Sequence, residues 1–115
     1  MFSSHLVGLT AWETIMKTVD VLVVRIYITE SSNLLSKIVK YLQKEVNIRG
    51  ISVFRAVSGF GESGSHGAAL IDMSLDLPLA IEFFDDKEKV EPALEHLKQI
   101  LKPEHIVFWP AQANV

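Results

Sequence analysis

The sequence of 115 residues contains no cysteine. This absence excludes a catalytic thiol, a thiolate metal site and a disulfide framework, and it favours a reducing compartment. No apolar run approaches the roughly 18 residues that a membrane span requires. Residues 1–17 also lack the basic residues that precede the apolar stretch of a secretory signal peptide. We therefore expect a soluble, cytoplasmic protein that does not insert into a membrane.

An excess of positive charge is missing as well. The chain has 11 lysines and arginines against 14 aspartates and glutamates, for a net charge of −3, which does not favour nucleic acid as a partner. Its length allows one domain, which we expect at residues 18–115. Residues 1–17 read as an N-terminal appendage that is either disordered or a short helix over residues 11–17, because Thr10 and Glu13 have the spacing of a capping box.

The sequence contains few of the motifs that are typical of catalytic or metal-binding sites. The four histidines fall in four different predicted segments, at His5, His66, His96 and His105. The sequence therefore gives no sign of a catalytic triad, in which a histidine base and an orienting acid activate a nucleophile. The sequence has no G-x-S-x-G elbow and no H-x-H or H-E-x-x-H spacing for a metal. We expect a protein that is not an enzyme, binds no metal and requires no cofactor.

Alternating apolar and polar residues predict the strands. Residues 19–29 (VDVLVVRIYIT) are rich in β-branched side chains, which is typical of a strand. The even positions from Leu22 to Ile28 are all apolar, whereas the odd positions include Arg25 and Tyr27, so one face of this strand should pack on a core. Further strands are expected at residues 51–58, 68–74, 78–84 and 106–109.

Helical spacing predicts a first helix after the first strand. Apolar residues recur every three or four positions over residues 34–46, with Ser31 or Ser32 as the N-cap and Asn47 at the end.

A second helix is predicted from Asp85 or Asp86 to Leu101, and Pro92 should either kink it or move its start to Glu91. The order of elements predicts an α+β fold, the ferredoxin-like split βαβ sandwich, with two helices on one face of an antiparallel sheet. The other face would be open, which favours an oligomer. Arg25 on this open face has an alternative, purely structural reading as the partner of Glu82.

The segment Gly59–Gly67 (GFGESGSHG) is the most informative stretch. Its four glycines would let backbone amides approach an anion closely. Arg55, four residues earlier, could pair with a phosphate through two parallel hydrogen bonds. The alternative is a plain connection between strands, with Arg55 paired to Glu82 or Asp72 across the sheet. From the residues alone, both interpretations stay open.

Three blocks of the chain, in the right order, resemble the PII-like group of bacterial and archaeal signalling proteins, which are relatives of the nitrogen-regulatory PII proteins. The blocks are VLVVRIYITES at residues 21–31, SVFRAVSGFGESGSH at residues 52–66 and LDLPLAIEFFD at residues 75–85. The resemblance implies a homotrimer that binds an adenine nucleotide in clefts between subunits. It also implies signalling to a target protein such as a membrane transporter or an enzyme.

The resemblance also implies which residues form the nucleotide site. Arg25 and Glu30 match the family's first-strand block. The residues expected to form the site are Arg25, Arg55, Ser58, Gly59, Phe60, Gly61 and His66. In this interpretation the loop amides and Arg55 hold phosphate, and Arg25 adds charge from the sheet. Phe60 packs near the base, and His66 either contacts the ligand or braces the loop.

Two departures from the PII pattern bear on the ligand. Residues 62–64 (ESG) stand where PII proteins have basic and amide residues, and LKPEHIVF at residues 101–108 replaces a glycine-rich segment. AMP or ADP is therefore expected ahead of ATP. Two other functions remain open at this point: a metal- or anion-sensing trimer similar to CutA proteins, and an interaction adaptor with no small ligand.

Overall fold

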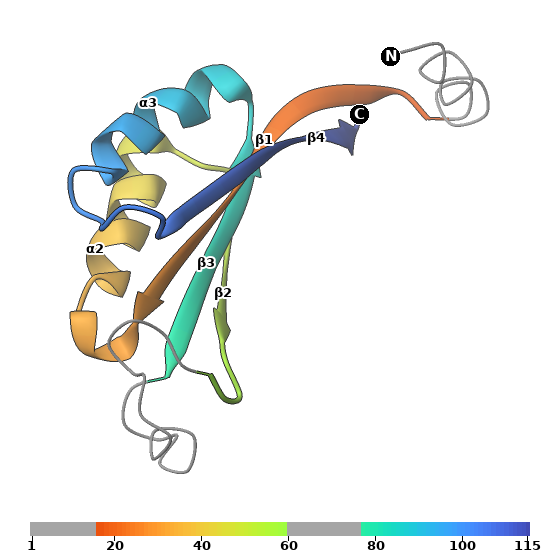
Figure 1. Ribbon diagram of the computed structural model, residues 1–115. Helices are drawn as coiled ribbons and strands as arrows, with labels where there is room; N and C mark the ends of the chain where they lie inside the picture. The colour runs from red at the N-terminus through yellow and green to blue at the C-terminus, as the bar shows by residue number, and fades with distance from the viewer. Residues whose placement is uncertain (1–15, 60–76) are drawn as a thin grey trace.

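The computed structural model describes residues 16–59 and 77–115. They form a four-stranded antiparallel sheet of order β2-β3-β1-β4, with the helices on one side of it (Figure 1). In chain order the elements are β1 (Thr18–Thr29), the 3₁₀ turn η1 (Glu30–Ser32), α2 (Leu35–Lys40), the π-helical segment η2 (Tyr41–Val46), β2 (Ile51–Arg55), β3 (Pro78–Asp85), α3 (Lys87–Leu97) and β4 (Ile106–Asn114). The expected α+β, ferredoxin-like fold is confirmed.

Two predicted elements cannot be compared with the structure. The strand expected at residues 68–74 lies outside the described residues, and so does almost all of the helix expected at residues 11–17. Within the described ranges, no helix combines the length and the apolar character that crossing a membrane requires.

The core lies between the helices and the inner face of β1 and β3. Every second residue of β1 from Leu22 to Ile28 is buried, and so are Leu79, Ile81 and Phe83 of β3. The register aligns these residues across the two strands, with Ile26 opposite Ile81. The predicted alternation is therefore confirmed, because successive strand residues point to opposite faces.

The first predicted helix is present, but it has two parts. α2 continues without a break into η2, whose backbone is π-helical, and the pair buries Ile38 and Leu42 completely. The segment ends at Asn47, which has a left-handed φ of 63°, as predicted. The predicted serine cap is wrong: the N-cap of α2 is Leu34, because Ser31 and Ser32 are part of η1 instead.

Two prolines have less effect than their positions in the sequence suggest. α3 begins at Lys87, not at Glu91, and contains Pro92 in its interior. The amides of Lys89 and Val90 already donate to the carbonyl of Asp86, so the first turn is closed before the proline is reached. β4 runs past Pro110 to Asn114, because an edge strand loses no ladder bond if the missing N–H faces outward.

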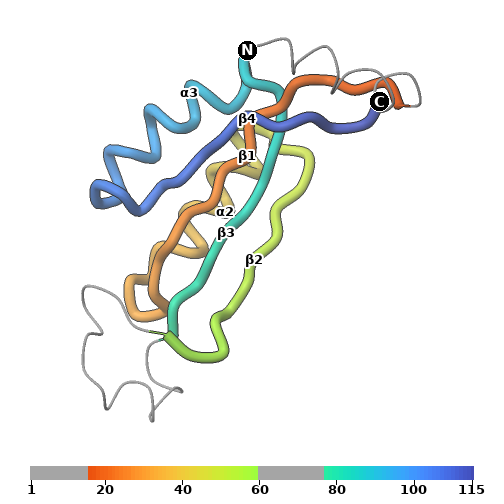
Figure 2. Tube along the Cα trace, turned by 45° about the vertical axis from the view of Figure 1, so that its right-hand side comes forward, coloured from red at the N-terminus to blue at the C-terminus, as the bar shows by residue number. Residues whose placement is uncertain are grey.

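β1 and β4 form a long antiparallel ribbon. Their pairing extends from Thr18 opposite Asn114 to Ile26 opposite Ile106. Figure 2 shows the start of β1, in red, beside the end of β4, in blue. Beyond the paired residues, the amide of Val115 donates to the carbonyl of Lys17. The predicted strand at residues 106–109 is thus only the inner half of β4.

Asp85 joins β3, α3 and the segment before β2. Its side chain is 1% exposed, and it is the one buried charged residue in the described ranges. It accepts hydrogen bonds from the amides of Asp86 (2.8 Å) and Arg49 (3.1 Å), and the charged ends of Arg49 and Lys89 lie 3.3 and 3.4 Å away. Burial alone would raise the pKa of Asp85, but these donors and cations outweigh it and hold the pKa below its ordinary value.

Asp85→Asn should destabilise the fold at neutral pH by about 2 kcal/mol, because an amide cannot accept both backbone bonds and leaves one buried donor unpaired. A carboxylate with a lowered pKa stabilises the folded state above its unfolded pKa of about 4. That contribution is lost as the pH falls through the folded pKa. Urea unfolding at fixed protein concentration, at neutral pH and in acid steps, should show the two proteins converging in acid.

Asp86→Asn is the matched control. Its side chain is 56% exposed and takes part only in a 3.8 Å ion pair with Arg49, so the substitution should cost much less. Equal losses for the two variants would contradict the role given to Asp85.

Candidate functional site

Among the described residues, no helix lies on one face of the sheet. Both α2 and α3 lie on the opposite side, as Figure 1 shows. The uncovered side, called the open face below, exposes between 38% and 53% of five large side chains. These are Tyr27, Phe54, Phe84, Val107 and Trp109, which the strand register places on the same face. A patch of this kind on a small domain marks an interaction surface.

Arg25 lies in the middle of the open face. Its Nε donates to Oε1 of Glu82 at 2.9 Å, and its register partner on β4 is Val107. The guanidinium also lies 5.9 Å from the centre of the Trp109 ring, within reach of a cation–π interaction. The hydrogen bond that Arg25 donates to Glu82 raises the pKa of Arg25. This hydrogen bond supports the structural interpretation of Arg25 as the partner of Glu82.

Arg55 lies on the other side of the sheet, at the last position of β2. Its register partner is Leu79, which points into the core. Its side chain forms an ion pair with Glu30, the first residue of η1. The hydrogen bond that Arg55 donates to Glu30 raises the pKa of Arg55. Of the two partners considered from sequence, Glu82 binds Arg25 instead, and Asp72 lies outside the described residues.

Ser58 and Gly59 follow β2 at the edge of the described chain. Ser58 is exposed in a bend, and Gly59 is partly buried. The backbone at this end is held by two hydrogen bonds, from the amide of Ala56 to the carbonyl of Pro78 and from that of Glu30 to the carbonyl of Leu77. These bonds hold the backbone next to Arg55 against the first residues of β3, and Ser58 and Gly59 follow shortly after along the chain.

The structure does not bring all the predicted site residues together. Phe60, Gly61 and His66 lie outside the described residues. Arg25 and Arg55 project from opposite faces of the sheet, and each has its own carboxylate partner. Within one subunit, the two arginines therefore do not converge on one anion.

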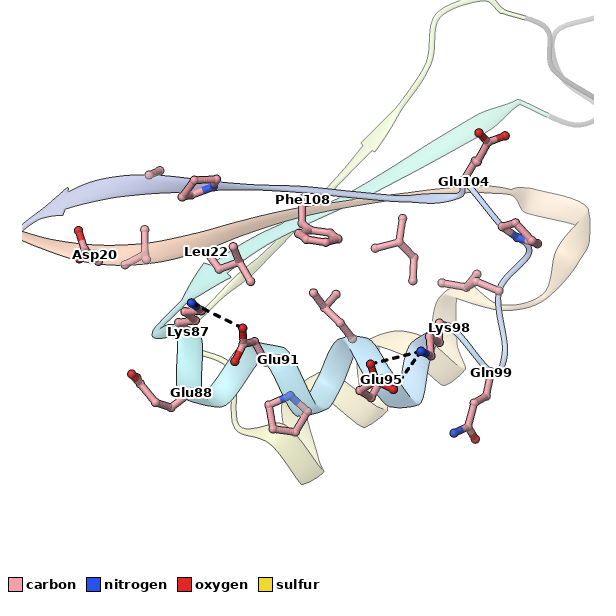
Figure 3. Close-up of a pocket in the computed structure, with 18 of the residues that line it drawn as sticks. Asp20, Leu22, Lys87, Glu88, Glu91, Glu95, Lys98, Gln99, Glu104 and Phe108 are labelled. Carbon is pink, nitrogen blue, oxygen red and sulfur yellow. Dashed lines mark hydrogen bonds and ion pairs between the residues drawn. The ribbon is translucent and has the colours of Figure 1, made fainter. Parts of the chain in front are cut away.

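A groove runs between α3, β4 and the start of β1 (Figure 3). Phe108 lies in it and is 55% exposed. Five acidic residues and three lysines line the groove. Two of these lysines are already paired, Lys87 with Glu91 at 3.8 Å and Lys98 with Glu95 at 3.0 Å. This charge balance does not favour an anion, and the groove lies at the β4 edge, away from the β2 edge that carries Arg55.

The two described histidines have structural contacts. The ring of His96 stacks on Tyr41 with centroids 4.2 Å apart, and Nδ1 of His105 lies 3.2 Å from the carbonyl oxygen of Tyr27. In the described ranges, no three histidine or acidic side chains gather in a way that could hold a metal ion.

Sequence reasoning missed the partner of Arg55 and the role of Asp85. Glu30 and Arg55 lie on elements that are not neighbours in the sheet, since β3 separates β1 from β2. The pattern of residues gives no strand order from which this contact could be found. For Asp85 a signal does exist, because an acidic residue directly after an apolar strand and before a helix is well placed to accept backbone amides.

Comparisons with known proteins agree with this architecture. The model of the family DUF190, described as "Uncharacterized ACR, COG1993", matches residues 21–113. A UPF0166 protein of Aquifex aeolicus is 32% identical over 88 residues, which cover 72% of this chain and 84% of that protein. A second UPF0166 protein of the same organism is 33% identical over 85 residues, covering 73% and 86%.

Among solved structures, the fold is similar to that of CPII from Thiomonas intermedia, which is described as a nitrogen regulatory PII-like protein. CPII bound to ADP, AMP and acetate gives a TM-score of 0.59 at 16% identity, over 87% of this chain and 92% of that one. CPII bound to ADP and bicarbonate gives 0.58 at 19% identity, with the same coverage. At this identity the likeness concerns the fold alone, and it confirms the expected resemblance to PII-like proteins.

Gly59→Ala should change the free energy of unfolding by less than about 1 kcal/mol, and in the stabilising direction. Gly59 has no positive φ, and an added Cβ would meet Cγ and Cδ of Pro78 at 3.4 and 3.9 Å, which are ordinary contacts. Gly50→Ala is the matched control, because nothing lies within 4 Å of its added Cβ. A marked loss of stability in the Gly59 variant alone, measured by urea unfolding, would contradict this expectation.

Proposed function

Since the chain belongs to the DUF190 (UPF0166) family and has the fold of PII-like proteins, we propose that it is a non-enzymatic regulator that binds an adenine nucleotide. In this proposal AMP or ADP binds in clefts between the subunits of a homotrimer. Binding is then conveyed to a target protein through the segment Gly59–Gly67.

One observation carries the proposal: Arg55 lies four residues before the glycine-rich segment that begins at Gly59, and the backbone next to Arg55 is hydrogen-bonded to the start of β3. A guanidinium can bind phosphate through two parallel hydrogen bonds, and the adjacent glycines let backbone amides approach it. Structures of CPII, which has a similar fold, contain ADP and AMP. These points support a phosphate-bearing ligand at this end of the sheet.

The open face supports the assembly. Its aromatic side chains remain in water in a single subunit, and burying them between subunits is favourable in proportion to their apolar area. The two sheet edges, β2 and β4, differ from one another. Contact between two different surfaces forms a ring of subunits when the rotation between them closes, and the proposed homotrimer is a ring of this kind. Such a ring would place the β2 end of one subunit, with Arg55, beside a neighbour.

Binding of AMP or ADP should raise the unfolding temperature of the protein, because a ligand at 100 times its dissociation constant adds about 2.7 kcal/mol of stability. Arg55→Ala should weaken binding about tenfold or more, since a hydrogen bond between charged groups contributes about 1.5–3 kcal/mol. Thermal unfolding with AMP, ADP or ATP present measures the first effect, and calorimetric titration with the same nucleotides measures the second.

Lys44→Ala is the control for that experiment, because it removes an exposed cation from η2 and leaves the β2 end intact. Unchanged affinity in the Arg55 variant would contradict the role of Arg55 in binding phosphate, and no binding of any of the three nucleotides would contradict the proposed function. A response to divalent metal ions alone would favour the metal-sensing alternative.

Phe54→Asp should convert the trimer into monomers, because it places a charge among the exposed aromatic side chains of the open face. Val115→Asp is the matched control: its side chain is 81% exposed at the end of the chain. Light scattering after size-exclusion chromatography gives the mass of each species. A Phe54 variant with the same mass as the unmodified protein would show that the open face is not the subunit interface.

A further inference from the structure

Arg55 already holds a carboxylate. Its guanidinium is paired with Glu30, yet the Arg55 side chain is 56% exposed and that of Glu30 is 31% exposed. A dissolved ligand can therefore reach the pair. An anion that approaches Arg55 meets the negative charge of Glu30 at close range, and like charges at such a distance repel each other. Tight binding of an anion to Arg55 thus requires the carboxylate to leave.

Glu30 is held beside Arg55 by its own backbone. Its amide donates to the carbonyl of Leu77, and its carbonyl accepts from the amide of Asn33, both at 3.4 Å. The amide of Ala56, next to Arg55, donates to the carbonyl of Pro78 at 3.0 Å. Both members of the ion pair therefore stand on segments bonded to residues 77–78. This arrangement gives the carboxylate a high effective concentration at the guanidinium.

From this geometry we propose that Glu30 is a built-in competitor that occupies the anion position at Arg55 and determines which ligands can take it. The inference rests on the proposed function, because it assigns Arg55 to ligand binding. Glu30 itself would not contact the bound ligand, so its role is to set affinity and selectivity.

The competition selects a class of ligand. A dissolved carboxylate or bicarbonate would replace one singly charged oxyanion with another and gain nothing against a tethered group. A terminal phosphate carries close to two negative charges at neutral pH and three acceptor oxygens, so it offers the guanidinium more than Glu30 does. The position at Arg55 is therefore reserved for phosphate groups, such as those of a nucleoside mono- or diphosphate.

Glu30→Gln keeps the length of the side chain and removes its charge. It should increase the affinity for ADP between about twofold and fivefold, the factor expected for losing one partly exposed ion pair. In the unmodified protein, acetate should not weaken ADP binding when ionic strength is matched. In the Glu30 variant, acetate should compete. Calorimetric titration of ADP with and without acetate measures both quantities.

Glu88→Gln is the matched control, because it removes a carboxylate from the first turn of α3 and leaves the Arg55 end unchanged. Its ADP affinity should equal that of the unmodified protein. Circular dichroism and the unfolding temperature verify that the Glu30 variant is folded. Unchanged or weaker ADP binding by the folded Glu30 variant would overturn the proposal, because Glu30 would then support the site and not compete for it.

The failure of this inference can be distinguished from the failure of the proposed function. If no form of the protein binds ADP, the proposed function is wrong, and inorganic pyrophosphate then serves as the probe of Arg55. Tighter pyrophosphate binding by the Glu30 variant would still support Glu30 as the competitor. Equal binding, or none by any form, would overturn this role as well.

Discussion

Both helices lie on one face of the sheet, and the strand connections impose this arrangement. The chain passes from β1 to β2 across β3, and from β3 to β4 across β1. Crossovers between parallel strands are right-handed, while β1 and β3 run in opposite directions. The two crossovers therefore place α2 and α3 on the same side. The core forms between these helices and the sheet, and the described helices leave the open face of the sheet uncovered.

The open face combines apolar area with one paired cation. Its aromatic side chains favour burial, whereas an unpaired charge among them would oppose it strongly. Arg25 does not introduce such an unpaired charge, because Glu82 lies directly opposite it on β3 and the Trp109 ring lies near its guanidinium. The face can therefore be covered by another subunit without leaving a bare cation in the interface.

The sequence was sufficient to predict what depends on local pattern. Alternation located β1 and β3, and helical spacing located α2 and α3, because a single periodicity decides each. The start of α3 at Lys87 and the extension of β4 beyond residue 109 were not predicted. The effect of a proline depends on whether its missing N–H was needed, and this depends on the closure of the first helical turn and on which strand is at the edge. Neither is visible from neighbouring residues.

The two arginine pairs show how far a site can be predicted. Arg25 and Glu82 are direct neighbours on adjacent strands, so this pairing could be considered from the sequence. Arg55 and Glu30 belong to strand ends that β3 separates, and only the folded chain brings them together.

This difference in position also separates their roles. The Arg25 pair lies mid-strand on the open face, where a neighbouring subunit would enclose it. The Arg55 pair lies at the end of β2, on the helix side and open to solvent. Covering the open face would therefore leave Arg55 accessible, so that assembly and anion binding can use different arginines without competing for the same charge.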